Sequence, residues 1–270
     1  MESLEGRSYG PYPLRVCAEK VAEFVDATRD DAGRWRQHAP PGWAAVCLFT
    51  VAPHLLESPE IAGRGVVHGE QKFTWHRPFD VEDTITVTGT VGSVRSRGGV
   101  DFVGFEMSVT AGGEEVADGS ATFLVSGDAP AAGDSEEEDE PSPGVAELND
   151  PPPASGEMGP MRRSASRADL IRYAAASRDW NPIHWDHATA RRAGLPGVVA
   201  HGLLQAAWLI SLGASLRPGP VPLAEAAVRF RAPLRPAMSC TVEGRLDGDS
   251  FLARSSVGES ELVVARMSLR

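Results

Sequence analysis

An aspartate and a histidine five positions apart, Asp179 and His184, are the residues of this sequence best suited to chemistry. Pro182 stands between them; it lacks a backbone N–H, fixes its own φ and disfavours helical geometry at Asn181. A helix that approaches Asp179 should therefore stop there, and both side chains should face one space from a loop. A carboxylate and an imidazole that hold one water molecule are suited to general acid–base catalysis.

A second candidate segment follows at His201 and Gly202, where an apolar stretch begins that runs to Leu212. The pattern predicts a helix that starts at Gly202. The first amides of a helix lack intrahelical partners and lie at the positive end of its dipole. Such N–H groups stabilise developing negative charge, while His201 is interpreted as the cap of the helix, with substrate contact as the alternative.

Length and charge limit the classes of protein that fit. The 270 residues are enough for two domains that each bury a core. The net charge of −11 is concentrated at residues 128–160, where ten acidic residues occur without Lys or Arg, so the remainder is no basic nucleic-acid binder. No apolar run approaches the roughly 20 residues of a membrane span. Three widely spaced cysteines indicate buried free thiols and a reducing cytoplasm.

The acidic segment 128–160 also contains seven prolines and few large apolar groups. Such a composition cannot offset the entropy of ordering, so the segment is predicted to be a disordered, extended linker without partners of its own. It separates two predicted domains, residues 1–127 and residues 161–270.

The two domains are predicted to be an internal duplication. Residues 24–30 match residues 173–179 at an offset of 149, and both close an amphipathic helix. Each half then has a helix that is apolar on all sides and hence buried, at 42–49 and at 202–212. Strands without helices between them follow, which favours an α+β fold with an antiparallel sheet wrapped on a helix. They are predicted at 84–94, 100–110, 115–125, 226–234, 238–246, 250–257 and 261–269.

With D-x-N-P-[IL]-H at 179–184 and A-H-G-[LM] at 200–203, the chain resembles the MaoC-like hot-dog family of (R)-specific enoyl-CoA hydratases and (3R)-hydroxyacyl-ACP dehydratases. Residues 167–212 are similar to the catalytic subunit of actinobacterial dehydratases of fatty-acid elongation, and residues 67–79 to the non-catalytic subunit. The resemblance implies a double hot dog, with two antiparallel sheets each wrapped on a long central helix. It also implies a non-catalytic N-terminal domain and a catalytic C-terminal domain.

The resemblance further implies roles for the site residues. Asp179 and His184 would share the proton transfers, and the N–H of Gly202 would bind the thioester carbonyl oxygen. Many relatives carry a small residue or glycine where this chain has Arg178, so that arginine is expected to affect substrate choice. Three residues are predicted to contact substrate: Asn181, His201 and Arg178.

Other polar residues are given plainer interpretations. The His-x-Asp-His cluster at 184–187 lacks the further ligand of a closed zinc site, and the sequence has no nucleotide-binding or serine-hydrolase motif, so neither a metal nor a cofactor is expected. His68 and His76 are predicted to be exposed strand positions. Four arginines are interpreted as surface charge, with contact to coenzyme A phosphates or a carrier protein as the alternative: Arg162, Arg163, Arg191 and Arg192.

The first half is predicted to lack a working site. Asp30 occupies the place of Asp179, but Trp35 falls where His184 would be. One active site per chain follows, and the bulk of Trp35 and Trp43 is predicted to shape the acyl tunnel.

These residues predict an enzyme of fatty-acid metabolism, a hydro-lyase that reversibly hydrates trans-2-enoyl thioesters to (3R)-3-hydroxyacyl thioesters. A hydratase of a short branched or dicarboxylic enoyl-CoA and a non-catalytic acyl-thioester binder are the alternatives, because fold alone does not fix function. The expected partner is an acyl-CoA or acyl-carrier-protein thioester, with a homodimer left open and no nucleic acid or membrane span expected.

Overall fold

The computed structural model describes residues 1–127 and 149–270. The described N-terminal half contains η1 (Glu2–Leu4), β1 (Ser8–Arg15), α1 (Ala18–Thr28), β2 (His38–Ala39), η2 (Pro41–Trp43), α2 (Ala44–Leu56), β3 (Gly65–Trp75), β4 (Phe79–Asp80), β5 (Thr84–Arg97), β6 (Val100–Ala111) and β7 (Glu114–Ser126). The C-terminal half contains β8 (Met161–Arg163), α3 (Arg167–Ser177), η4 (Pro182–His184), α4 (His187–Arg192), α5 (Gly202–Ala214), β9 (Leu223–Phe230), β10 (Cys240–Asp247), β11 (Ser250–Val257) and β12 (Ser260–Leu269).

The large strands form one continuous antiparallel sheet in the order β1-β5-β6-β7-β3-β9-β12-β11-β10-β8. Each half contributes five neighbouring strands, and the two sets meet where β3 pairs with β9. Glu70 lies opposite Arg229 and Phe73 opposite Ala226 across this seam. The predicted pair of sheets is therefore corrected to one sheet, because the edge strand of each half satisfies the free backbone groups of the other.

Helices α1 and α3 begin and end 149 residues apart, which confirms the predicted duplication. Each ends on an arginine in the left-handed conformation, Arg29 at φ 58° and Arg178 at φ 68°. Glycine is favoured at such a C-cap because it has no Cβ. The conformation gives a physical reason why glycine suits the position of Arg178.

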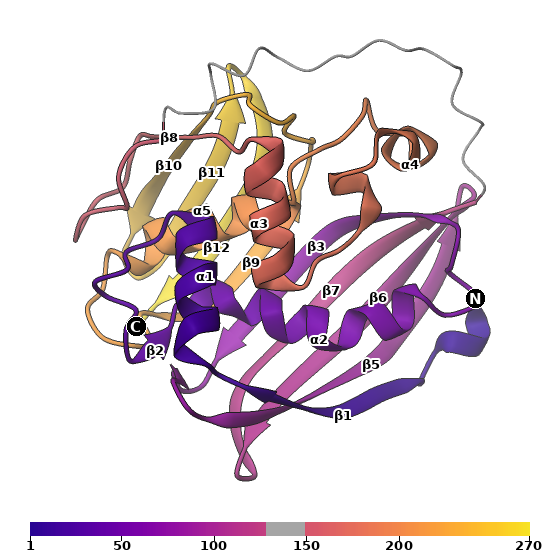
Figure 1. The fold of residues 1–270 in the computed structure, drawn as a ribbon, viewed down its shortest axis with the longest axis horizontal. Coiled ribbons are helices and arrows are strands. Elements are labelled where there is room, and N and C mark those ends of the chain that lie inside the picture. Colours follow the sequence, from indigo (N-terminus) through magenta and orange to yellow (C-terminus); the bar gives the residue numbers. More distant parts are fainter. Residues whose placement is uncertain (128–148) are drawn as a thin grey trace.

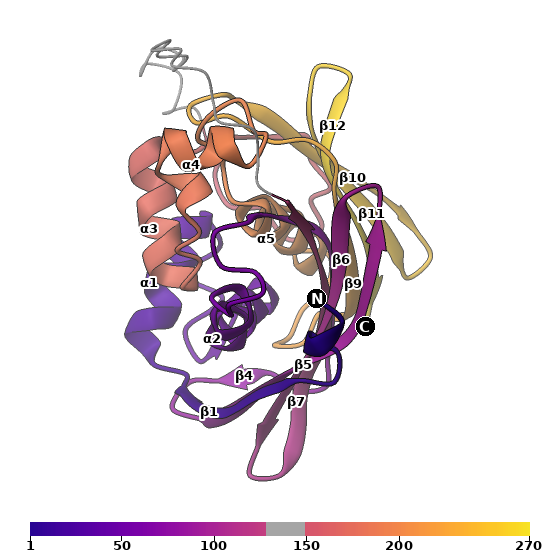
Figure 2. The same ribbon diagram turned by 90° about the vertical axis from the view of Figure 1, so that its right-hand side faces the viewer.

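The sheet curves around α2 and α5, and α1, α3 and α4 form an outer layer over these central helices (Figures 1 and 2). The burial predicted for the apolar helices is confirmed: every residue of Leu203–Ala214 is buried. Helix α2 is longer than predicted and continues through Pro53 to Leu56. Of the described helices, none has the length and apolarity that crossing a membrane requires.

The predicted linker is only partly covered by the structure. Residues 128–148 lie outside the described residues. Residues 149–160 are described and contact the C-terminal half: Asp150 accepts a bond from the backbone N–H of Arg162, and the N–H of Gly156 donates to the carbonyl of Ser215. Arg163 is 3% exposed and donates to the Asp150 carbonyl, so it is buried rather than a surface charge.

The three cysteines are free thiols, as expected. Cys47 and Cys240 are buried, while Cys17 is partly exposed. Burial raises the pKa of Cys240 to about 12, so this thiol stays protonated and unreactive at neutral pH.

Candidate active site

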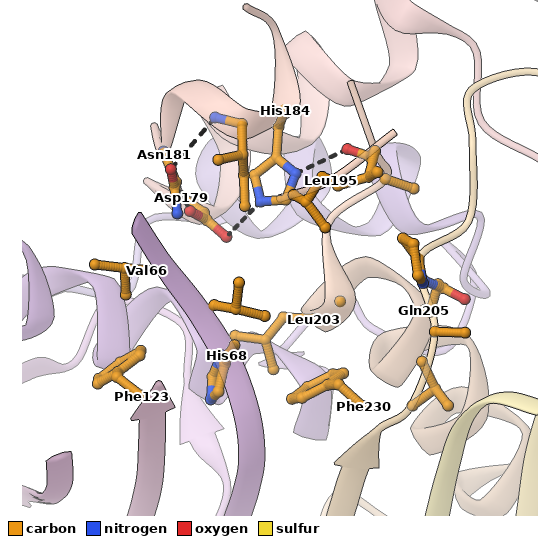
Figure 3. Close-up of a pocket in the computed structure, with 18 of the residues that line it drawn as sticks. Val66, His68, Phe123, Asp179, Asn181, His184, Leu195, Leu203, Gln205 and Phe230 are labelled. Carbon is orange, nitrogen blue, oxygen red and sulfur yellow. Dashed lines mark hydrogen bonds and ion pairs between the residues drawn. The ribbon is translucent and has the colours of Figure 1, made fainter. Parts of the chain in front are cut away.

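The end of α3 and a single turn of 3₁₀ helix bring Asp179 and His184 together. The Ser177 hydroxyl accepts a bond from the Asp179 N–H (3.2 Å) and donates to the last turn of α3. Asn181 caps η4 by accepting a bond from the Ile183 N–H (3.3 Å). The chain therefore folds back, and the side chains of Asp179 and His184 converge, with Oδ2 and Nε2 3.9 Å apart (Figure 3).

A backbone carbonyl fixes the orientation of His184. Its Nδ1 lies 2.8 Å from the carbonyl oxygen of Val199, which can only accept, so Nδ1 carries the proton. Nε2 then presents a lone pair toward Asp179. A separation of 3.9 Å is too long for a direct hydrogen bond, but a water or hydroxyl oxygen about 2.8 Å from each atom can bridge them.

Burial changes the acidity of both groups. Asp179 is 5% exposed and His184 is 7% exposed. Loss of solvation raises the pKa of Asp179 from 3.8 to about 7. A hydrogen bond from the Asn181 N–H lowers this pKa, but its effect is smaller. Loss of solvation lowers the pKa of His184 to about 4. Near neutral pH the pair thus combines a carboxyl group that titrates with an uncharged imidazole.

His201 lies behind this pair and not on the cavity wall. It is fully buried, its ring stacks on that of His184 with centroids 3.7 Å apart, and its Nε2 donates to the Asp179 carbonyl (3.2 Å). No side-chain cap of α5 is formed. His201 is the N-cap residue of α5, as predicted, but its side chain bonds to the Asp179 carbonyl and does not line the cavity, so no contact with substrate is seen.

The polar atoms of Asp179, His184 and His201 lie within 4.8 Å of one another, a grouping that metal sites also show. The two imidazole rings are stacked at 27°, however, so their lone pairs run in nearly parallel planes. Tetrahedral or octahedral ligands must converge on one point. The arrangement suits proton transfer better than coordination.

A cavity of about 270 Å³ opens beside the pair. Asp179, Asn181, His184 and Gly202 all contribute to its wall, as predicted for the site. The N–H of Gly202 is the first of α5 and has no acceptor in the described part of the chain. A Cβ at Gly202 would lie 2.8 Å from the Phe230 ring, so the glycine lets this ring pack over the helix start. The remaining lining is mostly apolar: Phe49, Leu56, Val66, Val67, Phe123, Ile183, Leu195, Val199, Ala200, Leu203, Phe230, Ala232, Pro233 and Val263.

Three polar residues of this wall were missed from the sequence, His68, Gln205 and Arg231. The prediction that His68 is exposed is wrong: its ring lies between Phe123 and Phe230, with centroids 5.0 Å and 4.8 Å away, and burial lowers its pKa to about 4. A register shift in the pairing of β3 with β7 falls between His68 and Glu70. This bulge reverses the alternation and turns His68 inward.

A second cavity, of about 670 Å³, adjoins the first at Asp179, Asn181 and Ile183. One side is formed by the end of α2, through Phe49, Pro53 and Leu56. Charged residues and an exposed tryptophan also line this cavity, and they include the predicted Arg178: Glu57, Arg64, Arg178, Trp180 and Arg192.

The first half contributes walls to both cavities, but not through the tryptophans that were predicted. Trp35 is 4% exposed and Trp43 is 1% exposed, and neither lines either cavity. Phe49 and Leu56 of α2 and Val66 of β3 do so instead. Phe49 is the last residue of the predicted helix, whereas Leu56 lies on the further turns of α2 that the prediction did not include.

The counterpart of Asp179 in the first half is closed off. Asp30 accepts bonds from the Ser211 hydroxyl (2.8 Å) and from the Asp31 N–H (2.7 Å). Trp35, at the place expected for a histidine, is packed in the core. Without a base beside it, Asp30 joins α5 to the first half and lies outside both cavities.

Comparison with family models divides the chain as the duplication does. Residues 154–265 match the MaoC like domain. Residues 3–119 match the FAS1-like, dehydratase domain region. The two matches together cover both halves and omit most of the acidic segment.

The curated relatives match less than half of this chain. A UPF0336 protein of Leifsonia xyli subsp. xyli is 39% identical over 142 residues, which cover 47% of this chain and 95% of that protein. A UPF0336 protein of Streptomyces coelicolor is 35% identical over 117 residues, 38% of this chain and 78% of that protein.

Among solved structures, a MaoC-like dehydratase aligns with TM-score 0.76 at 24% identity over 100% of this chain and 99% of that chain. HtdX of Mycobacterium tuberculosis aligns with TM-score 0.74 at 21% identity over 98% of this chain and 100% of that chain. Rv0216 of the same organism, described as a double hotdog fold, aligns with TM-score 0.62 at 12% identity over 98% of this chain and 96% of that chain. The expected double hot dog is confirmed.

Proposed function

The chain belongs to the MaoC-like dehydratase family, and from that premise we propose that it reversibly hydrates trans-2-enoyl thioesters to (3R)-3-hydroxyacyl thioesters. The observation that carries this proposal is the pair of buried atoms, Asp179 Oδ2 and His184 Nε2, held 3.9 Å apart on the wall of a largely apolar cavity. Gly202, whose N–H is free of partners in the described chain, lines the same cavity. An acid, a base and an oxyanion donor are the three groups that this reaction requires.

In the direction of hydration, His184 Nε2 accepts a proton from the bridging water as the water oxygen bonds to C3 of the enoyl group. The electrons of the C2–C3 double bond move toward the thioester, and protonated Asp179 delivers its proton to C2. One water molecule has then been added, with His184 protonated and Asp179 ionised. The proton returns from His184 to Asp179 through the next bridging oxygen, and dehydration follows the same steps in reverse.

The thioester carbonyl oxygen gains negative charge during this transfer. The Gly202 N–H lies at the positive end of the α5 dipole and is already free to donate. A preorganised donor in a site with little water stabilises that charge without reorganisation. Asn181 sets the turn that holds both reacting side chains, and it also lines both cavities, so we assign it to positioning and to contact with substrate.

The division of labour between the halves is part of the proposal. Residues 161–270 carry the acid, the base and the oxyanion donor, and residues 149–160 pack with them. Residues 1–127 form a non-catalytic domain that supplies part of the acyl wall through Phe49 and Leu56. Arg178 and Arg192 lie at the second cavity, where they would affect which thioester is accepted.

The test is turnover of crotonyl-CoA and of longer, branched and dicarboxylic trans-2-enoyl-CoA thioesters, followed by loss of the conjugated enoyl absorbance. We expect turnover and a product of (3R) configuration. Preference for a branched or dicarboxylic substrate would support the narrower hydratase. Binding without turnover at every chain length would overturn the proposal in favour of an acyl-thioester binder.

The pH dependence of the rate follows from the two shifted pKa values. Hydration needs Asp179 protonated and His184 neutral, so kcat/KM is expected to fall as pH rises through about 7 and as it drops toward about 4. Dehydration needs the same number of protons on the pair, with the proton on His184, and should show the same profile. Rate measurements in both directions check this; a hydration rate that rises through pH 7 would mean that ionised Asp179 is the active form.

A further inference from the structure

Gln205 is a polar residue in an apolar wall. It lies one turn after Gly202 on α5, is 1% exposed and lines the smaller cavity. Its amide oxygen accepts a bond from the Ser255 hydroxyl (3.2 Å). Figure 3 shows Gln205 on the side of the cavity away from Asp179 and His184.

The amide nitrogen of Gln205 has no acceptor within residues 1–127 and 149–270. This nitrogen is not sealed off from solvent, unlike several other unpartnered polar atoms of the protein. Because Gln205 lines the smaller cavity, we take the cavity to be the space that the nitrogen meets. A buried donor that stays unpaired costs about 1–3 kcal/mol. The site therefore favours a ligand that brings an acceptor to this point.

The other polar side chains of the described wall, away from the turn at 179–184, are those of His68 and Arg231. His68 has an unpartnered Nε2, but that atom is sealed and cannot reach a ligand. Arg231 pairs with Glu261 (3.3 Å), and its side chain is 53% exposed, which places it at the rim. We therefore take Gln205 as the hydrogen-bond donor that a ligand meets inside the smaller cavity.

The spacing along α5 identifies the acceptor. Residues three apart lie on the same face of a helix, about 4.5 Å apart along its axis. With the thioester oxygen on the Gly202 N–H, the group near Gln205 lies a few bonds away from the carbonyl carbon. In a pantetheine thioester, two methylenes separate the sulfur from an amide, whose carbonyl oxygen is an acceptor at that reach.

We propose that the side-chain amide of Gln205 binds the first amide of the pantetheine arm and so selects pantetheine thioesters over simple ones. This rests on the proposed hydratase function. It also sets the direction of the substrate: the arm runs over α5 toward Gln205 and the rim at Arg231. The acyl chain runs the opposite way, past Asp179 into the second cavity, where Phe49 and Leu56 form the wall.

The experiment compares two small substrates of equal chain length, the N-acetylcysteamine and S-pentyl thioesters of crotonic acid, of which only the first carries the amide. We expect wild-type protein to prefer the amide thioester in kcat/KM. Gln205→Leu should reduce that preference about three- to ten-fold, the range of one hydrogen bond. Gln37→Leu, which makes the same change at an exposed residue of the first half, should leave the preference unchanged.

If Gln205→Leu does not fold, Gln205→Asn withdraws the amide by one methylene and should reduce the preference in the same way. Crotonyl-CoA and crotonyl-carrier protein share the arm, so the variant should lose the same factor on both. An unchanged preference in a folded, active variant overturns the role of Gln205. Wild-type protein without activity on any of these thioesters overturns the hydratase function instead, so the two failures are distinguishable.

Discussion

Asp179→Asn is expected to lower kcat/KM for enoyl-thioester hydration by about 10² to 10⁴, the contribution of one general acid. Asparagine has nearly the same size, and its side-chain oxygen can still accept the bond from the Asn181 N–H. What it lacks is a proton to deliver to C2 of the substrate. Because the turn to His184 should survive, the loss belongs mainly to kcat, and substrate binding should change little.

The duplication supplies a matched control. Asp30 occupies the equivalent position in the first half and is partly buried, but it bonds to Ser211 and lies outside both cavities. Asp30→Asn keeps an oxygen that can accept from the Ser211 hydroxyl and should retain near wild-type rates. Comparable losses in the two variants would contradict the assignment of Asp179, as would a rate in Asp179→Asn close to that of wild type.

Local rules account for most of what was predictable from sequence. The turn at Pro182 was read from proline's missing N–H and fixed φ, and η4 begins at that residue. The offset of 149 between repeated segments placed both α1 and α3 correctly. The buried helices were visible as stretches that are apolar on every side. The turn and the buried helices depend on neighbours within a few residues, and the repeat can be found by comparing the chain with itself.

Pairing between distant segments was not predictable in the same way. Nothing in the alternation of β3 or β9 indicates which edges meet, so the union of two sheets through Glu70 and Arg229 had no local signal. The bulge beside Gly69 does have a weak local signal in the sequence, because glycine within a strand often marks a bulge. A Cβ at Gly69 would lie 2.3 Å from a Leu124 methyl carbon, which explains the glycine and the inward turn of His68.

The positions of His201 and Trp43 show a further limit. Both are polar-tipped rings beside the predicted site, and spacing alone places either of them on a cavity wall. Packing decides otherwise: Trp43 meets Phe79 edge-on at 5.4 Å, and His201 stacks on His184. Whether a ring lines the cavity depends on how the core side chains pack, and spacing along the chain does not determine that packing.

The two halves differ at two points: the first has no base beside Asp30, and it supplies part of the cavity wall. Asp30 remains as a carboxyl group that bonds to α5, and Phe49 and Leu56 face the chemistry of the other half. A site between two domains needs only one acid–base pair. The second copy is then free to change its shape, which gives a physical route from a symmetric ancestor to one catalytic centre.

Asp179→Asn is also expected to stabilise the protein above pH 7, by about 4 kcal/mol in the free energy of unfolding. Burial raises the pKa of Asp179 from 3.8 to about 7, so the folded state binds its proton more tightly than the unfolded state. Wild-type stability is therefore unaffected by this group below pH 3.8, falls as pH rises toward 7, and carries the whole penalty above that. Asparagine is neutral throughout and removes the penalty.

The measurement is thermal or denaturant unfolding of both proteins at about pH 5 and about pH 8. The difference between variant and wild type should be much larger at the higher pH. Asp30 gains a bond from Ser211 and lies near Arg34, so Asp30→Asn should give a smaller gain. A variant that is no more stable than wild type at alkaline pH would mean that Asp179 is ionised in the folded state at ordinary cost, and the acid role assigned to it would fail with that result. Gain of stability together with loss of turnover is the signature of a carboxyl group kept in an unfavourable place for its chemistry.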